Sequence, residues 1–154
     1  MKRLILLSLL VFITAIACKK DKKKEINKPI SETLKGEWIT ISENRNYFDS
    51  ANNKIFEKID NSPGSKYVID ASITKKDLQN NVNFSSAYSI SNMNGKNFIS
   101  FTENGVTQTY EIVYIDLKMM TWKQEKANQT YDDNGAKVAA KQVVTINFHC
   151  PCRD

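Results

Sequence analysis

Histidine is almost absent from this chain of 154 residues, which has a single one, His149. Cysteine is scarce as well, with Cys150 and Cys152 beside that histidine and one more near the N-terminus. A structural zinc site takes four ligands, and a catalytic site takes three and a water molecule. One imidazole and two thiols would need carboxylates to complete such a site, so we predict no metal centre and no other cofactor.

Glycine is also rare, with five residues, and the chain has neither a glycine-rich phosphate loop nor a dinucleotide-binding turn. A G-x-S-x-G nucleophile elbow and an HExxH motif are missing too. Paired carboxylates that lie far apart in the sequence are the one catalytic arrangement that remains open. We predict that the protein is not an enzyme.

The region predicted to fold has no net formal charge. The whole chain has a formal charge of +5, but the first 25 residues hold seven of its 22 basic and two of its 17 acidic residues. From Ile26 onward there are 15 of each. A nucleic-acid-binding domain carries a basic face, so we expect no nucleic-acid partner.

No apolar run is long enough to cross a membrane, which takes roughly 20 residues. The apolar run near the N-terminus, Leu4 to Ala17, has only fourteen uncharged residues and follows a positive start at Lys2 and Arg3. Small residues then precede Cys18. A positive start, an apolar run and small residues are the layout of a cleaved secretory signal peptide, predicted here over residues 1–17.

The stretch Ala15-Ile16-Ala17-Cys18 resembles the bacterial lipobox. This resemblance implies that Cys18 receives a diacylglyceryl group and becomes the first residue of the mature protein. Two or three acyl chains hold a protein on a membrane far more firmly than one. We therefore expect a lipid-anchored protein of the bacterial cell envelope, at its outer membrane, with a lysine-rich tether over residues 18–28.

Residues 29–154 are predicted to form one all-β domain of about eight antiparallel strands. Apolar and polar residues alternate over short runs, as in half-buried strands; the runs are 66–73, 83–91, 106–115 and 142–148. Asn-Gly pairs, which favour tight hairpin turns, separate such runs at Asn94-Gly95, Asn104-Gly105 and Asn134-Gly135. Only residues 30–35 read as a helical turn. A meander of this kind removes its sheet edges by closing into a barrel.

The sequence Leu34-Lys35-Gly36-Glu37-Trp38 follows this helical turn and resembles the G-x-W motif that opens the first strand of lipocalins. The resemblance implies a small lipocalin-like barrel behind a lipoprotein leader. It implies structural roles for Gly36 and Trp38, and a late hairpin with a tight turn at Asp116 to Lys118.

An eight-stranded barrel can hold one small ligand. The aromatic residues expected to face the interior, and therefore to bind it, are Tyr67, Phe84, Tyr88, Tyr110 and Tyr114. Their apolar rings and hydroxyl groups suit a binding module for a small apolar or amphipathic ligand. The alternative is an interaction or assembly lipoprotein, whose barrel is filled solid and whose partner is another envelope protein.

The C-terminal cysteines leave three alternatives open. After lipidation of Cys18, Cys150 and Cys152 are the remaining thiols, and export would place them in an oxidising compartment. We expect a disulfide between them, strained because the two residues are so close in sequence. Free or intermolecular thiols and a metal site are the other two alternatives.

The lipobox generates the first prediction. Replacing Cys18→Ala removes the lipid acceptor, so the variant should lose its membrane retention and accumulate as an unprocessed or soluble form. Membrane fractionation followed by immunoblotting measures this. Tight membrane binding with normal leader cleavage in the variant would contradict the lipoprotein assignment.

Overall fold

The computed structural model describes residues 28–61 and 63–151. The predicted signal peptide, the predicted anchor Cys18, the tether up to residue 27 and Cys152 lie outside the described residues. The described part contains one short helix and ten strands: α2 (Ile30–Thr33), β1 (Gly36–Phe48), β2 (Lys54–Asp60), β3 (Ser65–Ile69), β4 (Ile73–Asp77), β5 (Val82–Ser86), β6 (Tyr88–Met93), β7 (Lys96–Glu103), β8 (Val106–Ile115), β9 (Met119–Asp132) and β10 (Ala136–His149).

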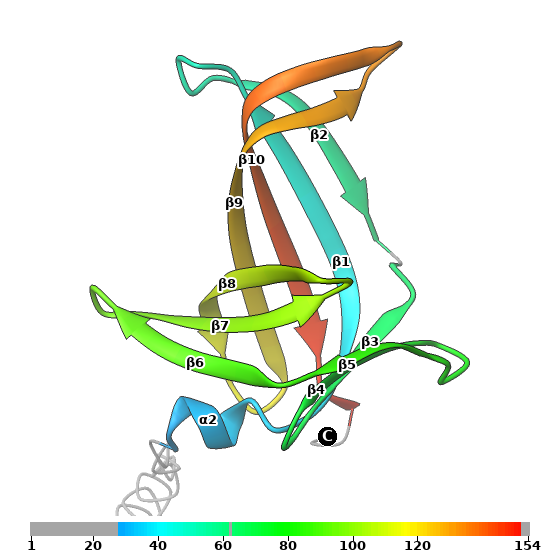
Figure 1. Ribbon diagram of the computed structural model, residues 1–154, viewed down its shortest axis with the longest axis vertical. Helices are drawn as coiled ribbons and strands as arrows, with labels where there is room; N and C mark the ends of the chain where they lie inside the picture. Colours follow the sequence, from blue (N-terminus) through cyan, green and yellow to red (C-terminus); the bar gives the residue numbers. More distant parts are fainter. Residues whose placement is uncertain (1–27, 62, 152–154) are drawn as a thin grey trace, which may run out of the picture.

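All strands belong to one antiparallel sheet in the order β5-β4-β3-β1-β10-β9-β8-β7-β6, and β2 pairs with the end of β1 that β3 leaves free. The all-β meander is thus confirmed (Figure 1). The number of strands was underestimated, because two alternating runs are each split. Residues 70–72 turn between β3 and β4, and Ala87 separates β5 from β6.

The turns follow the predicted Asn-Gly signals. Asn94, Asn104 and Asn134 all have positive φ angles, as do the glycines that follow them. Asparagine and glycine are the residues that adopt this left-handed backbone most readily. The tight turn after β8 is also present, and there the Asp116 amide donates to the Met119 carbonyl oxygen at 2.9 Å.

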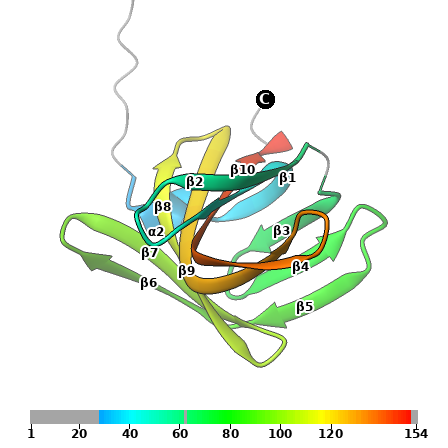
Figure 2. The same ribbon diagram turned by 90° about the horizontal axis from the view of Figure 1, so that it is seen from above.

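Pairing of β1 with β10, the first strand with the last, bends the meander into a nearly closed barrel. Figure 2 looks along the barrel and shows β3 to β5 on one side and β6 to β8 on the other. The two free edges approach each other where the Thr102 amide of β7 donates to the Ser86 hydroxyl of β5 at 3.1 Å. Among the described residues, no helix is long and apolar enough to cross a membrane.

The half of the barrel next to α2, here called the base, is filled with aromatic side chains. Trp122 lies at the centre of this core. Its ring centroid is 4.8 Å from that of Phe148, 5.4 Å from Tyr110 and 5.5 Å from Tyr67. All four residues are buried. Rings at these distances leave no room for a ligand in the base.

Helix α2 closes the base, and Gly36 and Trp38, at the start of β1, link the strand to the helix. The Trp38 side chain is 0% exposed, and its indole Nε1 donates to the Leu34 carbonyl oxygen at 2.7 Å. Gly36 has a φ of 137°, which residues with a Cβ rarely adopt. The G-x-W segment therefore turns the chain from the helix into the first strand.

This burial generates the second prediction. Trp38→Ala should lower the free energy of unfolding by about 3–5 kcal/mol, because it opens a cavity and leaves the Leu34 carbonyl without its donor. Trp38→Phe keeps a ring and should cost less. Urea titration measures both variants. A loss below about 1 kcal/mol for the alanine variant would contradict the packing role of Trp38.

Candidate binding pocket

A β-bulge in β1 decides which of its side chains face the barrel interior. The pairs with β10 run through Thr40 and resume at Ser42, so Ile41 is an extra residue without a partner in β10. Such a bulge reverses the alternation of side chains beyond it. Simple alternation from Trp38 would have turned Ser42 inward, and the bulge turns its neighbour Glu43 inward instead.

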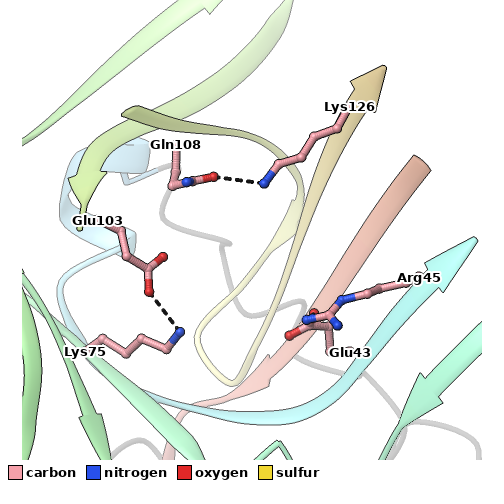
Figure 3. Close-up of polar contacts among 6 residues, drawn as sticks. All are labelled: Glu43, Arg45, Lys75, Glu103, Gln108 and Lys126. Carbon is pink, nitrogen blue, oxygen red and sulfur yellow. Dashed lines mark hydrogen bonds and ion pairs between the residues drawn. The ribbon is translucent and has the colours of Figure 1, made fainter. Parts of the chain in front are cut away.

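Charged side chains of β1 consequently join the interior above the aromatic core. Glu43 pairs with Ile146 and Arg45 pairs with Val144, both of which are buried core residues of β10. Paired residues of neighbouring strands share a face of the sheet. Glu43 and Arg45 therefore line the barrel at its upper end, away from α2 (Figure 3).

A pocket of about 250 Å³ opens at this upper end. Its floor is the top of the aromatic core, and its walls are mainly charged and amide side chains. Seven strands contribute to it, β1, β3, β4 and β7 to β10. The lining residues are Glu43, Arg45, Tyr67, Lys75, Glu103, Gln108, Tyr110, Gln124, Lys126, Gln142, Val144 and Ile146.

Both carboxylates of the pocket are paired with a cation. The Lys75 Nζ lies 3.1 Å from the Glu103 Oε1 and joins β4 to β7 across the gap in the barrel. Glu43 forms an ion pair with Arg45, its neighbour on the same face of β1. Figure 3 shows the two pairs on different sides of the opening.

Lys126, by contrast, is held by a neutral group. Its Nζ donates to the Gln108 Oε1 at 3.2 Å, and the Gln124 Nε2 donates to the same oxygen at 3.2 Å. Within the described residues, no carboxylate forms an ion pair with Lys126. The pocket lining thus holds three cations and two carboxylates.

Two phenols form part of the floor. Tyr67 and Tyr110 are 4% and 7% exposed, and burial raises the pKa of both above the ordinary value of 10.0. The negative charge of Glu103 raises the pKa of each phenol further. Both therefore stay neutral at physiological pH and keep a proton to donate. In the described part of the chain, neither hydroxyl has a hydrogen-bond partner.

Only two of the five residues predicted to bind a ligand line the pocket. Tyr67 and Tyr110 line the pocket. Phe84 and Tyr88 pack against the core below it, and the Tyr88 hydroxyl donates to the Asp70 carbonyl oxygen at 3.0 Å. These two side chains are therefore part of the packing and not of the pocket lining.

The predicted inward position of Tyr114 is wrong. The pairing of β8 with β9 shifts between Ile112 and Tyr114, so Val113 is an extra residue and the alternation reverses. Tyr114 is 50% exposed and donates its hydroxyl proton to the Asp116 carboxylate, while Ile115 packs against the core in its place.

Sequence reasoning missed the polar walls of the pocket. On β8 to β10 a signal was available, because Gln108, Gln124 and Gln142 each stand two residues from a buried core residue and share its face. Following the alternation upward from the aromatic core would have found them. The bulge at Ile41 hid Glu43 and Arg45, since no sequence pattern marked it.

The tail carries no second site within the described residues. Cys150 is buried at the base, and its amide donates to the Lys118 carbonyl oxygen at 2.8 Å. Its predicted disulfide partner Cys152 lies outside the described residues, so the disulfide stays a prediction. In the described ranges no three His, Cys, Asp or Glu side chains gather as they would around a metal ion.

Comparison with protein-family models, with curated proteins and with solved structures finds no match for this chain. The chemistry of the pocket and the sequence of the leader are what point to a function.

The two buried phenols generate the third prediction. Above pH 10.0 the unfolded chain loses the protons of Tyr67 and Tyr110, whereas the folded state keeps them. The free energy of unfolding should therefore fall as the pH rises above that value, and these groups contribute no pH dependence below it. A Tyr67→Phe, Tyr110→Phe double variant should lose stability less steeply. Urea titrations at neutral and alkaline pH measure the fall in the free energy of unfolding for the wild type and for the double variant. An equal fall in both would contradict the raised pKa values of Tyr67 and Tyr110.

Proposed function

We propose that the chain is a lipid-anchored lipoprotein of the bacterial cell envelope whose lipocalin-like barrel is a non-catalytic binding module for a small amphipathic ligand. The pocket above the filled core carries this proposal. Its floor offers the rings of Tyr67 and Tyr110, and its walls offer charged and amide groups. Apolar surface with a few converging polar groups is typical of ligand sites.

The size and lining of the pocket narrow the choice of ligand. Pockets for drug-sized ligands typically measure about 300–1,000 Å³, so a pocket of about 250 Å³ suits a smaller molecule. A purely apolar ligand would cover the hydroxyl groups of Tyr67 and Tyr110 and the amide of Gln142 and leave them without hydrogen bonds, which is costly. The filled base also leaves an apolar ligand no deeper space. An amphipathic ligand fits both surfaces.

The leader supports the anchor, and the described chain begins at the end of the barrel opposite the pocket. Residue 28, where the described chain begins, leads into α2 at the base (Figure 1). The pocket lies above the aromatic core, at the other end of the barrel. A protein anchored through Cys18 would therefore present its pocket away from the membrane surface, toward ligands in the surrounding solution.

The second candidate, an interaction or assembly lipoprotein, is favoured by the filled base and by β2. Within the described residues β2 pairs with β1 alone, so its other edge is open, and Ile55 and Ile59 are exposed on it. An open strand edge can pair with a strand of a partner protein. In this case the pocket would hold no ligand.

The fourth prediction separates the two candidates. Native mass spectrometry of the delipidated protein, purified from its own host, should show an additional small mass. Gln124→Trp puts a large ring into the pocket wall and should abolish that mass. The matched control is Gln129→Trp, on the same strand but outside the pocket lining.

The melting temperature of both variants checks that they fold. Wild-type protein without an additional mass would contradict the binding module and favour the interaction lipoprotein. An additional mass that persists in the Gln124→Trp variant would place the ligand elsewhere on the protein.

A further inference from the structure

We infer that the ligand of this pocket is a small organic anion, a carboxylate attached to a short ring or chain, and that Lys126 binds its charged group. The inference rests on the proposed function, because it names the chemical class of the ligand for the same pocket. Three observations carry it: the charge balance of the lining, the lack of a carboxylate partner for Lys126, and an excess of free donors.

The pocket lining has one more cation than it has carboxylates. Glu103 is neutralised by Lys75, and Glu43 is neutralised by Arg45. The Lys126 ammonium group donates a hydrogen bond to the uncharged amide oxygen of Gln108. A ligand carboxylate would complete a third ion pair in a half-enclosed site, where such a pair is stronger than in open water. A cationic ligand would meet a lining that is already positive.

The uncharged polar groups are also donors for an anion. Tyr67, Tyr110 and Gln142 are no more than 7% exposed, and all three line the pocket. In the described part of the chain their side chains have no hydrogen-bond partner. Their polar atoms are open to the pocket, where a ligand can reach them. The two phenol hydroxyls and the amide can each donate a hydrogen bond to a polar group of the ligand, and none of them adds a negative charge that would repel an anion.

The position of these donors limits the length of the ligand. The phenols of Tyr67 and Tyr110 belong to the aromatic core, since both rings lie within 5.5 Å of the Trp122 ring. Lys126 approaches from β9 and meets Gln108 across the opening (Figure 3). A ligand between the floor and Lys126 has room for about one ring, consistent with the cavity of about 250 Å³.

The experiment uses three probes of nearly equal size and different charge: benzoate, benzamide and benzylammonium. Their binding to the purified full chain is measured by isothermal titration calorimetry. Benzoate should bind, and the neutral and cationic probes should bind much more weakly. Lys126→Met should weaken benzoate binding roughly ten- to a hundredfold, the effect of losing a hydrogen bond to a charged group. Lys126→Arg should retain it.

The chain supplies a matched control and a gain-of-affinity variant. Lys123→Met lies on the same strand but on the opposite face, where Lys123 pairs with Glu125, and it should not change benzoate binding. Glu103→Gln keeps the shape of the side chain and releases Lys75 from its ion pair. The pocket then holds one more unpaired cation, so benzoate should bind several-fold more tightly.

The outcomes distinguish this inference from the proposed function. Benzamide binding equal to that of benzoate, or unchanged benzoate binding in the Lys126→Met variant, would overturn the anion inference and leave the binding module standing. No binding of any probe would also overturn it, and the native mass spectrum then decides about the binding module. A neutral or cationic retained ligand would overturn the inference by itself.

Discussion

The antiparallel pairing of β1 with β10 is the interaction on which the rest of the structure depends. It joins the two ends of the described domain, from Ile39 opposite His149 to Phe48 opposite Lys141. Without it, each strand would still pair with another strand, but the sheet would divide into two, one of β1 to β5 and one of β6 to β10. Contacts between such distant residues form late and slowly in folding, because a long loop must close first. The barrel, its core and its pocket exist only after this step.

Within that pairing, the extra residue Ile41 marks the boundary between the aromatic core and the polar pocket. Below Ile41, the inward positions of β1 belong to the packed core, as Trp38 shows. Above it, Glu43 and Arg45 turn inward. The aromatic half supplies the apolar burial that stabilises a domain of this size. The polar half turns charged and amide side chains toward the barrel interior, where they contribute less apolar burial. Local conflicts of this kind are expected at functional sites.

The fold could be predicted from the sequence to a large extent, because alternation and Asn-Gly turns are local signals that tertiary packing did not override. Two errors had a common cause. Tyr114 faces outward and Glu43 faces inward because a bulge shifts the alternation before each of them. Neither bulge is marked by a glycine or a proline. The charge pairing in the pocket depends on which strands meet across the barrel gap, as Lys75 and Glu103 do, and no local pattern contains that information.

The bond between Trp38 and Leu34 has a mechanical consequence for an anchored protein. In the anchored protein proposed above, a pull at residue 28 would enter the domain through α2 and pass directly into β1. The force then acts along the strand, at right angles to its hydrogen bonds with β10, because antiparallel ladders run perpendicular to the strands. Many bonds share such a load at once instead of opening one after another. The first strand is therefore both the closing strand of the barrel and the element best placed to resist extraction by shear.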